Sequence, residues 1–98
     1  MMKGAACPLW MSVSAPQAAD TLAWAYYQKG AYSLAIGLLQ ETVKKLPQEP
    51  IYHFHLGLAY QKSGDLVRAR VHLKRALELN PNFEKAGEIR KALGEIGD

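Results

Sequence analysis

The sequence has little of several features that mark specialised classes of protein. Its one cysteine, Cys7, cannot form a disulfide within a single chain, so a reducing compartment is the simpler interpretation. No apolar run is long enough to cross a bilayer, and we expect no membrane span. The net charge of +3 falls well short of the excess typical of nucleic-acid-binding proteins. At 98 residues, 49% of them hydrophobic, the chain fits one small globular domain.

Residue patterns for catalysis and metal binding are also lacking. His53 and His55 are two positions apart, which places them on different faces of a helix instead of one chelating edge. His72 belongs to another predicted helix, and we interpret the histidines as structural. We find no Ser-His-Asp set, phosphate-binding loop or paired carboxylates in the sequence. We therefore expect no enzyme activity, no metal and no cofactor.

What the sequence does contain is a repeat of 34 residues. Residues 16–49 and residues 50–83 align without a gap, and a period of this length is typical of stacked repeats. In such stacks each unit buries its apolar face against its neighbours, and the usual function is to bind other proteins. The matching positions are Pro16/Pro50, Leu22/Leu56, Ala25/Ala59, Tyr26/Tyr60, Gly30/Gly64, Ala35/Ala69, Leu39/Leu73 and Pro47/Pro81.

The turns predicted from each copy divide it into two helices. Gly30 and Gly64 fall between the halves, where a helix end needs a residue that tolerates positive φ. Asp65 follows as a candidate N-cap. Pro47 and Pro81 stop the second helices, because the residue before proline avoids the helical region. The prediction is an all-α fold of helix, tight turn, helix and proline-marked turn, repeated.

Apolar residues in the second half of each copy recur at steps of three and four, as on one face of a helix. These stripes are Tyr32, Ala35, Ile36, Leu39, Thr42, Val43 and Leu46, and then Leu66, Ala69, Leu73, Ala76 and Leu77.

Residues 84–98 are predicted to form a capping helix, as part of an amphipathic segment from about Phe83 to Ile96. Such a helix covers one side of a stack and presents its polar side to water. Its narrow apolar stripe is Phe83, Ala86, Ile89, Leu93 and Ile96.

Residues 1–15 lie outside the repeat, and we predict an irregular N-terminal arm. Lys3 and the apolar stretch ending in Val13-Ser14-Ala15 resemble a short secretory signal. Pro8 interrupts this stretch, and Pro16 would directly follow the cleavage site. We expect a cytoplasmic protein and keep export as the alternative.

These features together resemble the tetratricopeptide repeat (TPR) family, which implies a short right-handed α-solenoid of about five helices. The second copy carries the family pattern at His53, Leu56, Gly57, Tyr60, Ala69, Leu73, Ala76 and Pro81. The first carries it more loosely at Ala19, Leu22, Ala23, Tyr26, Ala35, Leu39, Thr42 and Pro47. Except for Ala19, Thr42 and His53, we expect these residues to pack the repeats together.

The resemblance also implies a concave groove lined by the first helix of each repeat. Apart from Lys62, the groove lacks the cations with which some family members hold a peptide's terminal carboxylate, so we do not expect that mode of binding. Its large apolar groups favour a partner surface over simple packing. The groove positions are Trp24, Tyr27, Gln28, Ile51, Phe54, His55, Leu58, Gln61 and Lys62, with Gln17, Asp20 and Thr21 beside them.

Departures from the family pattern leave alternatives open. Ala19 stands where a large aromatic is usual, and stability usually requires three repeats or more. The leading interpretation is an adaptor or assembly scaffold that binds a helix or extended peptide. An alternative is a homo-oligomer, expected as a dimer when alone, that buries the groove or the N-terminal face. A nucleic-acid binder acting through Arg68, Arg70, Lys74 and Arg75 is disfavoured, because the aromatics lie on the other helix.

Overall fold

The computed structural model describes residues 16–97 and folds them into five α-helices without strands. The predicted all-α fold is confirmed, while the predicted N-terminal arm, residues 1–15, lies outside the described residues. No helix in this described part of the chain has the length and apolar character needed to span a membrane. The helices are α2 (Pro16–Gln28), α3 (Tyr32–Lys45), α4 (Pro50–Ser63), α5 (Leu66–Leu79) and α6 (Ala86–Ile96).

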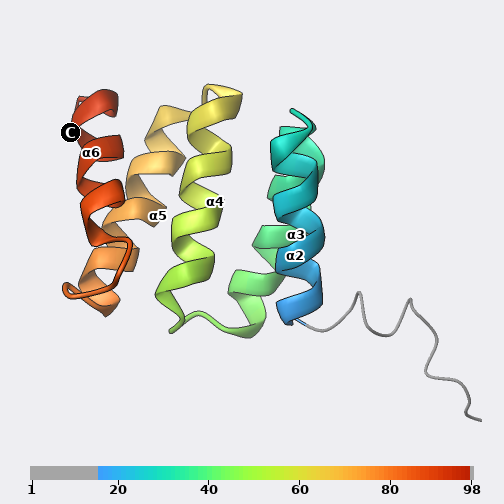
Figure 1. Ribbon diagram of the computed structural model, residues 1–98, viewed down its shortest axis with the longest axis horizontal. Coiled ribbons are helices and arrows are strands. Elements are labelled where there is room, and N and C mark those ends of the chain that lie inside the picture. Colours follow the sequence, from blue (N-terminus) through green and yellow to red (C-terminus); the bar gives the residue numbers. More distant parts are fainter. Residues whose placement is uncertain (1–15, 98) are drawn as a thin grey trace, which may run out of the picture.

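The helices form two layers. In Figure 1, α2, α4 and α6 lie toward the viewer, and α3 and α5 lie behind them. α2 packs with α3 and α4 packs with α5, while α3 also packs on α4 and α5 also packs on α6. Each pair of helices is one repeat, so the described chain is a short helical solenoid that α6 closes at one end.

A glycine forms the turn within each repeat. Gly30 has a φ of +86° and Gly64 has a φ of +94°, a left-handed conformation that other residues adopt only at a cost. In the second repeat Asp65 then caps α5, because its carboxylate accepts a hydrogen bond from Arg68 N at 3.2 Å. The predicted glycine turns and the predicted Asp65 cap are confirmed.

Prolines mark the ends of the second helices. α3 ends at Lys45, two residues before Pro47, and α5 ends at Leu79, two residues before Pro81. Both prolines are exposed. They therefore terminate helices, as predicted, but do not pack the repeats together.

The core divides into two clusters along the stack. Leu22, which we expected to pack the repeats, is only partly buried because no described element covers it on the side away from α4. Tyr26 is also partly buried, but it packs against the cluster between the repeats, as expected. The cluster between the repeats contains Ala23, Ala35, Leu39, Leu56, Ala59, Tyr60 and Ala69. The cluster beneath α6 contains Phe54, Leu73, Ala76, Ile89, Ala92 and Leu93.

Gly57 allows the closest approach of two helices. A Cβ atom at this position would lie 2.7 Å from Leu73 Cδ2 and 3.3 Å from the Ala69 carbonyl oxygen. Leu73 is fully buried, so a shift of its side chain would disturb the packing around it. The pairing of α4 with α5 therefore depends on a glycine here, in agreement with the packing role that the family resemblance implies.

Two details of the apolar stripes differ from the sequence prediction. Leu66 is 42% exposed instead of buried, because it is the first residue of α5 and lies at the turn. The capping helix begins at Ala86 instead of near Phe83. The backbone before it makes two tight turns, in which Asn80 O accepts from Phe83 N and Phe83 O accepts from Ala86 N.

Candidate functional site

The front layer of helices contains a groove of about 350 Å³ between α2, α4 and α6. The lining residues recur along each helix at steps of one, three or four, so each helix contributes one face. The lining residues are Trp24 and Tyr27 from α2, Leu58, Gln61 and Lys62 from α4, and Glu88, Lys91, Ala92 and Glu95 from α6.

The α2 side of the groove is an aromatic wall formed by Trp24 and Tyr27. Their rings stack with centroids 4.5 Å apart and planes 5° from parallel. Tyr32 packs edge-on against Tyr27 at 5.5 Å. Burial, and then the nearby Tyr32, raises the pKa of the Tyr27 hydroxyl, which therefore stays protonated and can donate a hydrogen bond.

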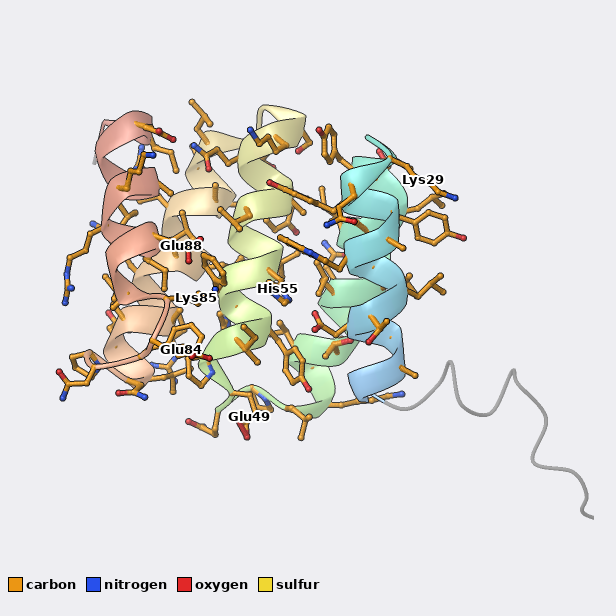
Figure 2. The ribbon with its side chains drawn as sticks, in the orientation of Figure 1. Lys29, Glu49, His55, Glu84, Lys85 and Glu88 are labelled. Carbon is orange, nitrogen blue, oxygen red and sulfur yellow. The ribbon has the colours of Figure 1, made fainter. Side chains whose placement is uncertain are left out.

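A polar pair behind the wall holds it in place. His55 Nδ1 lies 2.6 Å from Asp20 Oδ1, and the two side chains are only 14% and 18% exposed. A carboxylate only accepts hydrogen bonds, so His55 Nδ1 is the donor. The His55 ring also stacks on Trp24, with centroids 4.5 Å apart. Figure 2 shows His55 reaching from α4 toward α2, so this pair joins the first helices of the two repeats.

The opposite side of the groove is charged. Glu88, which Figure 2 places between α6 and α4, pairs with Lys85 at 3.3 Å. Glu95 accepts a hydrogen bond from Gln61 Nε2 at 3.2 Å. Within the described part of the chain, Lys62 and Lys91 form no ion pair, although both line the groove. Beside the aromatic wall the groove thus carries both signs of charge: two ammonium groups without ion-pair partners among the described residues, and the carboxylates of Glu88 and Glu95.

Several residues expected in the groove lie elsewhere. Phe54 is 3% exposed and packs against Phe83 in the core beneath α6, with ring centroids 6.2 Å apart. Ile51 is partly buried against the same core, and Gln28 is exposed outside the groove lining. His55 lies behind Trp24. These four residues do not line the groove, whereas Trp24, Tyr27, Leu58, Gln61 and Lys62 do.

The sequence did not predict that α6 lines the groove, because residues 84–98 were expected only to cap the stack. The repeat period itself indicates that α6 lies beside the groove. Adding 34 to Phe54, Leu58 and Gln61 gives Glu88, Ala92 and Glu95, so α6 occupies the place of a third first helix.

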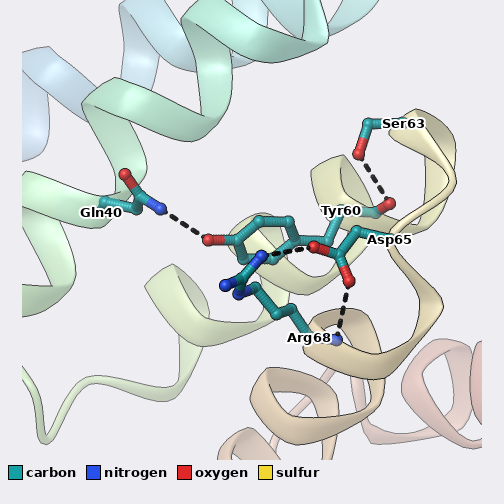
Figure 3. Close-up of polar contacts among 5 residues, drawn as sticks. All are labelled: Gln40, Tyr60, Ser63, Asp65 and Arg68. Atoms are coloured by element: carbon teal, nitrogen blue, oxygen red, sulfur yellow. Dashed lines mark hydrogen bonds and ion pairs between the residues drawn. The ribbon is translucent and has the colours of Figure 1, made fainter.

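A second polar network joins the two repeats on the α3 and α5 side. His53 Nε2 donates to the Pro47 carbonyl oxygen at 2.9 Å, so its Nδ1 is free to accept from His72 Nδ1 at 3.1 Å. Burial, and then the nearby His53, lowers the pKa of His72 from 6.5 to about 4, which keeps its ring neutral. Gln40 Nε2 donates to the Tyr60 hydroxyl at 2.6 Å (Figure 3), and Tyr60 stacks on His72.

Two arginines of α5 form ion pairs with acidic residues close to them in the sequence. Arg68 pairs with Asp65 at 2.9 Å, as Figure 3 shows, and Arg75 pairs with Glu78 at 3.4 Å. The Arg68 hydrogen bonds hold the pKa of the Asp65 carboxyl below its usual value. Among the residues that the structure describes, no group of three or more histidine, cysteine, aspartate or glutamate side chains is placed to hold a metal ion.

Two family models match the chain. One is described as "Tetratricopeptide repeat" and matches residues 50–83, and the other is described as "TPR repeat" and matches residues 24–64. Together the two matches cover residues 24–83, from within α2 to just beyond the end of α5. No curated protein matches the chain.

Proposed function

Because the chain belongs to the tetratricopeptide repeat family, whose repeats generally mediate protein–protein interactions, we propose that its groove binds a segment of a partner protein. The bound segment is a helix or an extended peptide, and the chain acts as an adaptor or assembly scaffold. The observation that carries this proposal is the stacked Trp24–Tyr27 wall, which faces the groove and is held from behind by His55.

The aromatic wall supplies the affinity in this proposal. Trp and Tyr are common among the side chains that dominate binding energy at interfaces. A fully covered aromatic buries about 150–250 Å², worth about 25 cal/mol per Å². Trp24 and Tyr27 are already partly buried, so a partner gains only part of this area before the cost of its ordering. The stacking of Trp24 on Tyr27 and His55 fixes both rings before binding, which lowers that cost.

In this proposal the two lysines of the groove select for partner segments that carry acidic side chains. Lys62 of α4 and Lys91 of α6 line the same groove as the wall and have no ion-pair partner among the described residues. A segment that places an apolar side chain on Trp24 and an acidic side chain beside these lysines satisfies both sides of the groove. Such rim charges mainly accelerate association and exclude cationic partners, and salt weakens their effect.

Selection of a random peptide library against the intact protein tests this function. The chosen peptides are then titrated against the wild type and against Trp24→Ala, for which we expect at least a roughly tenfold loss of affinity. The control is Leu34→Ala, because Leu34 is 56% exposed on α3 in the other layer. Peptides that bind Trp24→Ala as tightly as the wild type would contradict the proposal.

A second variant tests the charged side without touching the packing. Lys62→Glu combined with Lys91→Glu reverses two exposed charges, so the fold is retained. We expect this variant to lose affinity for peptides that contain Asp or Glu and to keep its affinity for uncharged peptides. Equal losses of affinity for both kinds of peptide would show that the lysines do not recognise acidic side chains.

A further inference from the structure

Both faces of the Trp24 indole are covered by other rings. Tyr27 stacks on the indole with planes 5° from parallel, and His55 stacks on it with planes 27° from parallel, each at a centroid distance of 4.5 Å. Two rings on the same face of an indole would touch each other, and among the described rings His55 and Tyr27 do not. They therefore lie on opposite faces of Trp24, and the groove meets the edge of the indole.

The column of rings continues beyond Trp24 on both sides. Tyr32 packs against Tyr27 with centroids 5.5 Å apart, and Phe54 packs against His55 with centroids 5.6 Å apart. The column thus runs from α4 across α2 to α3. Trp24 cannot turn a face toward the groove without breaking these contacts.

The edge and the face of an aromatic ring attract different groups. The face carries negative charge density and the edge positive, so an edge is attracted to the face of another ring. A cation binds to a face instead. The edge of Trp24 therefore favours an aromatic side chain of the partner over an arginine or a lysine.

The groove has room for one large side chain beside this edge. Its volume of about 350 Å³ is at the lower end of the range for small-ligand sites, about 300–1,000 Å³. Leu58 of α4 and Ala92 of α6 are one repeat period apart, and both add apolar surface to the lining. The groove can therefore hold a single anchor residue, while the rest of the segment lies along its rim.

We propose that the anchor of the bound segment is an aromatic side chain whose ring face meets the edge of Trp24. This inference rests on the proposed function and names the side chain that the groove selects. The anchor also packs against Leu58, and an acidic neighbour in the segment pairs with Lys62 or Lys91. A leucine anchor would gain the burial without the edge-to-face contact.

Three probe peptides that differ only at the anchor test this inference. Each is a short acetylated and amidated peptide with an aspartate on either side of the anchor, which is phenylalanine, cyclohexylalanine or pentafluorophenylalanine. Cyclohexylalanine matches phenylalanine in size and is at least as hydrophobic, but it has no negative face, and the fluorinated ring has a positive one. Titrations of the isotope-labelled full chain follow the indole N–H signal of Trp24, which Trp10→Phe identifies because Trp10 is the only other tryptophan.

We expect the phenylalanine probe to bind roughly 2–10-fold more tightly than the cyclohexylalanine probe, and the fluorinated probe to bind more weakly than both. A cyclohexylalanine probe that binds as tightly as phenylalanine would overturn the inference, because burial alone would then account for the affinity. Tightest binding by the fluorinated probe would also overturn it, since that ring would be stacking on an open face of Trp24.

Variants of His55 test whether the covered face sets this preference. A fourth probe, with arginine as its anchor, should bind the wild type weakly. His55→Ala uncovers one face of Trp24 and should raise the affinity for this probe by roughly two- to fivefold. His55→Phe is the matched control, because it loses the same hydrogen bond to Asp20 but keeps a ring on that face. Circular dichroism verifies that both variants fold, and a wild type that binds the arginine probe as tightly as the phenylalanine probe would overturn the inference without either variant.

Failure of this inference is separable from failure of the proposed groove function. Selected peptides that lose affinity for Trp24→Ala but show no preference for an aromatic anchor would contradict only the choice of anchor. Peptides that bind Trp24→Ala as tightly as the wild type would contradict the groove function, and with it this inference.

Discussion

The first helices of the two repeats have similar sequences but very different surroundings. Leu56 and Ala59 of α4 are 1% and 0% exposed, whereas their equivalents Leu22 and Ala25 are partly buried and exposed. Among the described side chains of α2, only Ala19 and Ala23 are buried. Identical residues at equivalent repeat positions therefore differ because α4 has helices packed on both of its sides, whereas the described residues cover α2 on one side only. Burial in a repeat protein is a property of the stack more than of the single repeat.

The repeats differ also in their polar groups. The second repeat has an N-cap at Asp65 and a hydrogen-bonded pair of histidines, His53 and His72. The equivalent positions in the first repeat are Ala31, Ala19 and Leu38. The second repeat thus uses specific polar contacts where the first uses small or apolar side chains, and substitutions between equivalent positions can test what each contact contributes.

The largest difference should appear when the same leucine is truncated in each repeat. Leu56→Ala should lower the free energy of unfolding by about 2–5 kcal/mol, because it leaves a cavity between the repeats. Leu22→Ala should lower it by less than half as much, since Leu22 already contacts water on one side. Urea denaturation in dilute solution, where any dimer has dissociated, measures both values. Equal losses would show that Leu22 is covered as fully as Leu56.

A smaller change in the free energy of unfolding is expected when the pH is lowered, because the second repeat contains the histidine pair. Folding lowers the pKa of His72 from 6.5 to about 4, so between these values the unfolded chain binds a proton that the folded chain does not. The free energy of unfolding is therefore unaffected by His72 above about pH 6.5, and it decreases as the pH falls toward 4. Because His72 is only partly buried, solvent screening reduces the effect, and we expect a loss of about 1–2 kcal/mol.

Replacement of the pair by the residues of the first repeat isolates this effect. His53→Ala with His72→Leu introduces the residues found at Ala19 and Leu38, and it removes both rings together so that no buried nitrogen loses its partner. Unfolding free energies at several pH values between 4 and 6.5 should depend less on pH in this variant than in the wild type. An unchanged slope would assign the pH dependence to other groups.

The fold could be predicted from the sequence because its determinants recur at the repeat period. Gly30 and Gly64 mark the turns within repeats, and Pro47 and Pro81 follow the second helices, so each boundary was indicated twice. The start of α6 was predicted less well, because residues 84–98 have no second copy with which to compare them. A helix boundary that is marked in both repeats can be predicted more reliably than the start of the capping helix, which occurs only once.

The candidate site could be predicted only in part, since it depends on how helices from different repeats meet. The aromatic wall follows from the spacing of Trp24 and Tyr27 within one helix. The position of Phe54 does not, because α6 and Phe83 cover a side chain that the repeat pattern alone would leave in the groove. The contact between Asp20 and His55 joins residues 35 positions apart, and no local pattern indicates it.

The smallest expected effect concerns the turns, which have nearly the same backbone in both repeats. Ala31 has φ −86° and ψ 65°, and its equivalent Asp65 has φ −88° and ψ 79°. Ala31 therefore already has the conformation of a capping residue but lacks the acceptor. Ala31→Asp should place a carboxylate near Leu34 N, as Asp65 lies near Arg68 N, and raise the free energy of unfolding by about 0.5–1 kcal/mol.

Urea denaturation of Ala31→Asp and of Ala31→Asn separates the two contributions to this cap. Both side chains accept the hydrogen bond, but only the aspartate adds the favourable interaction of a negative charge with the helix N-terminus. A larger gain for aspartate that shrinks in high salt would identify the charge contribution. If neither variant is more stable than the wild type, then similar backbone angles are not sufficient for a cap, and the contact of Asp65 with the Arg68 side chain must account for the difference between the repeats.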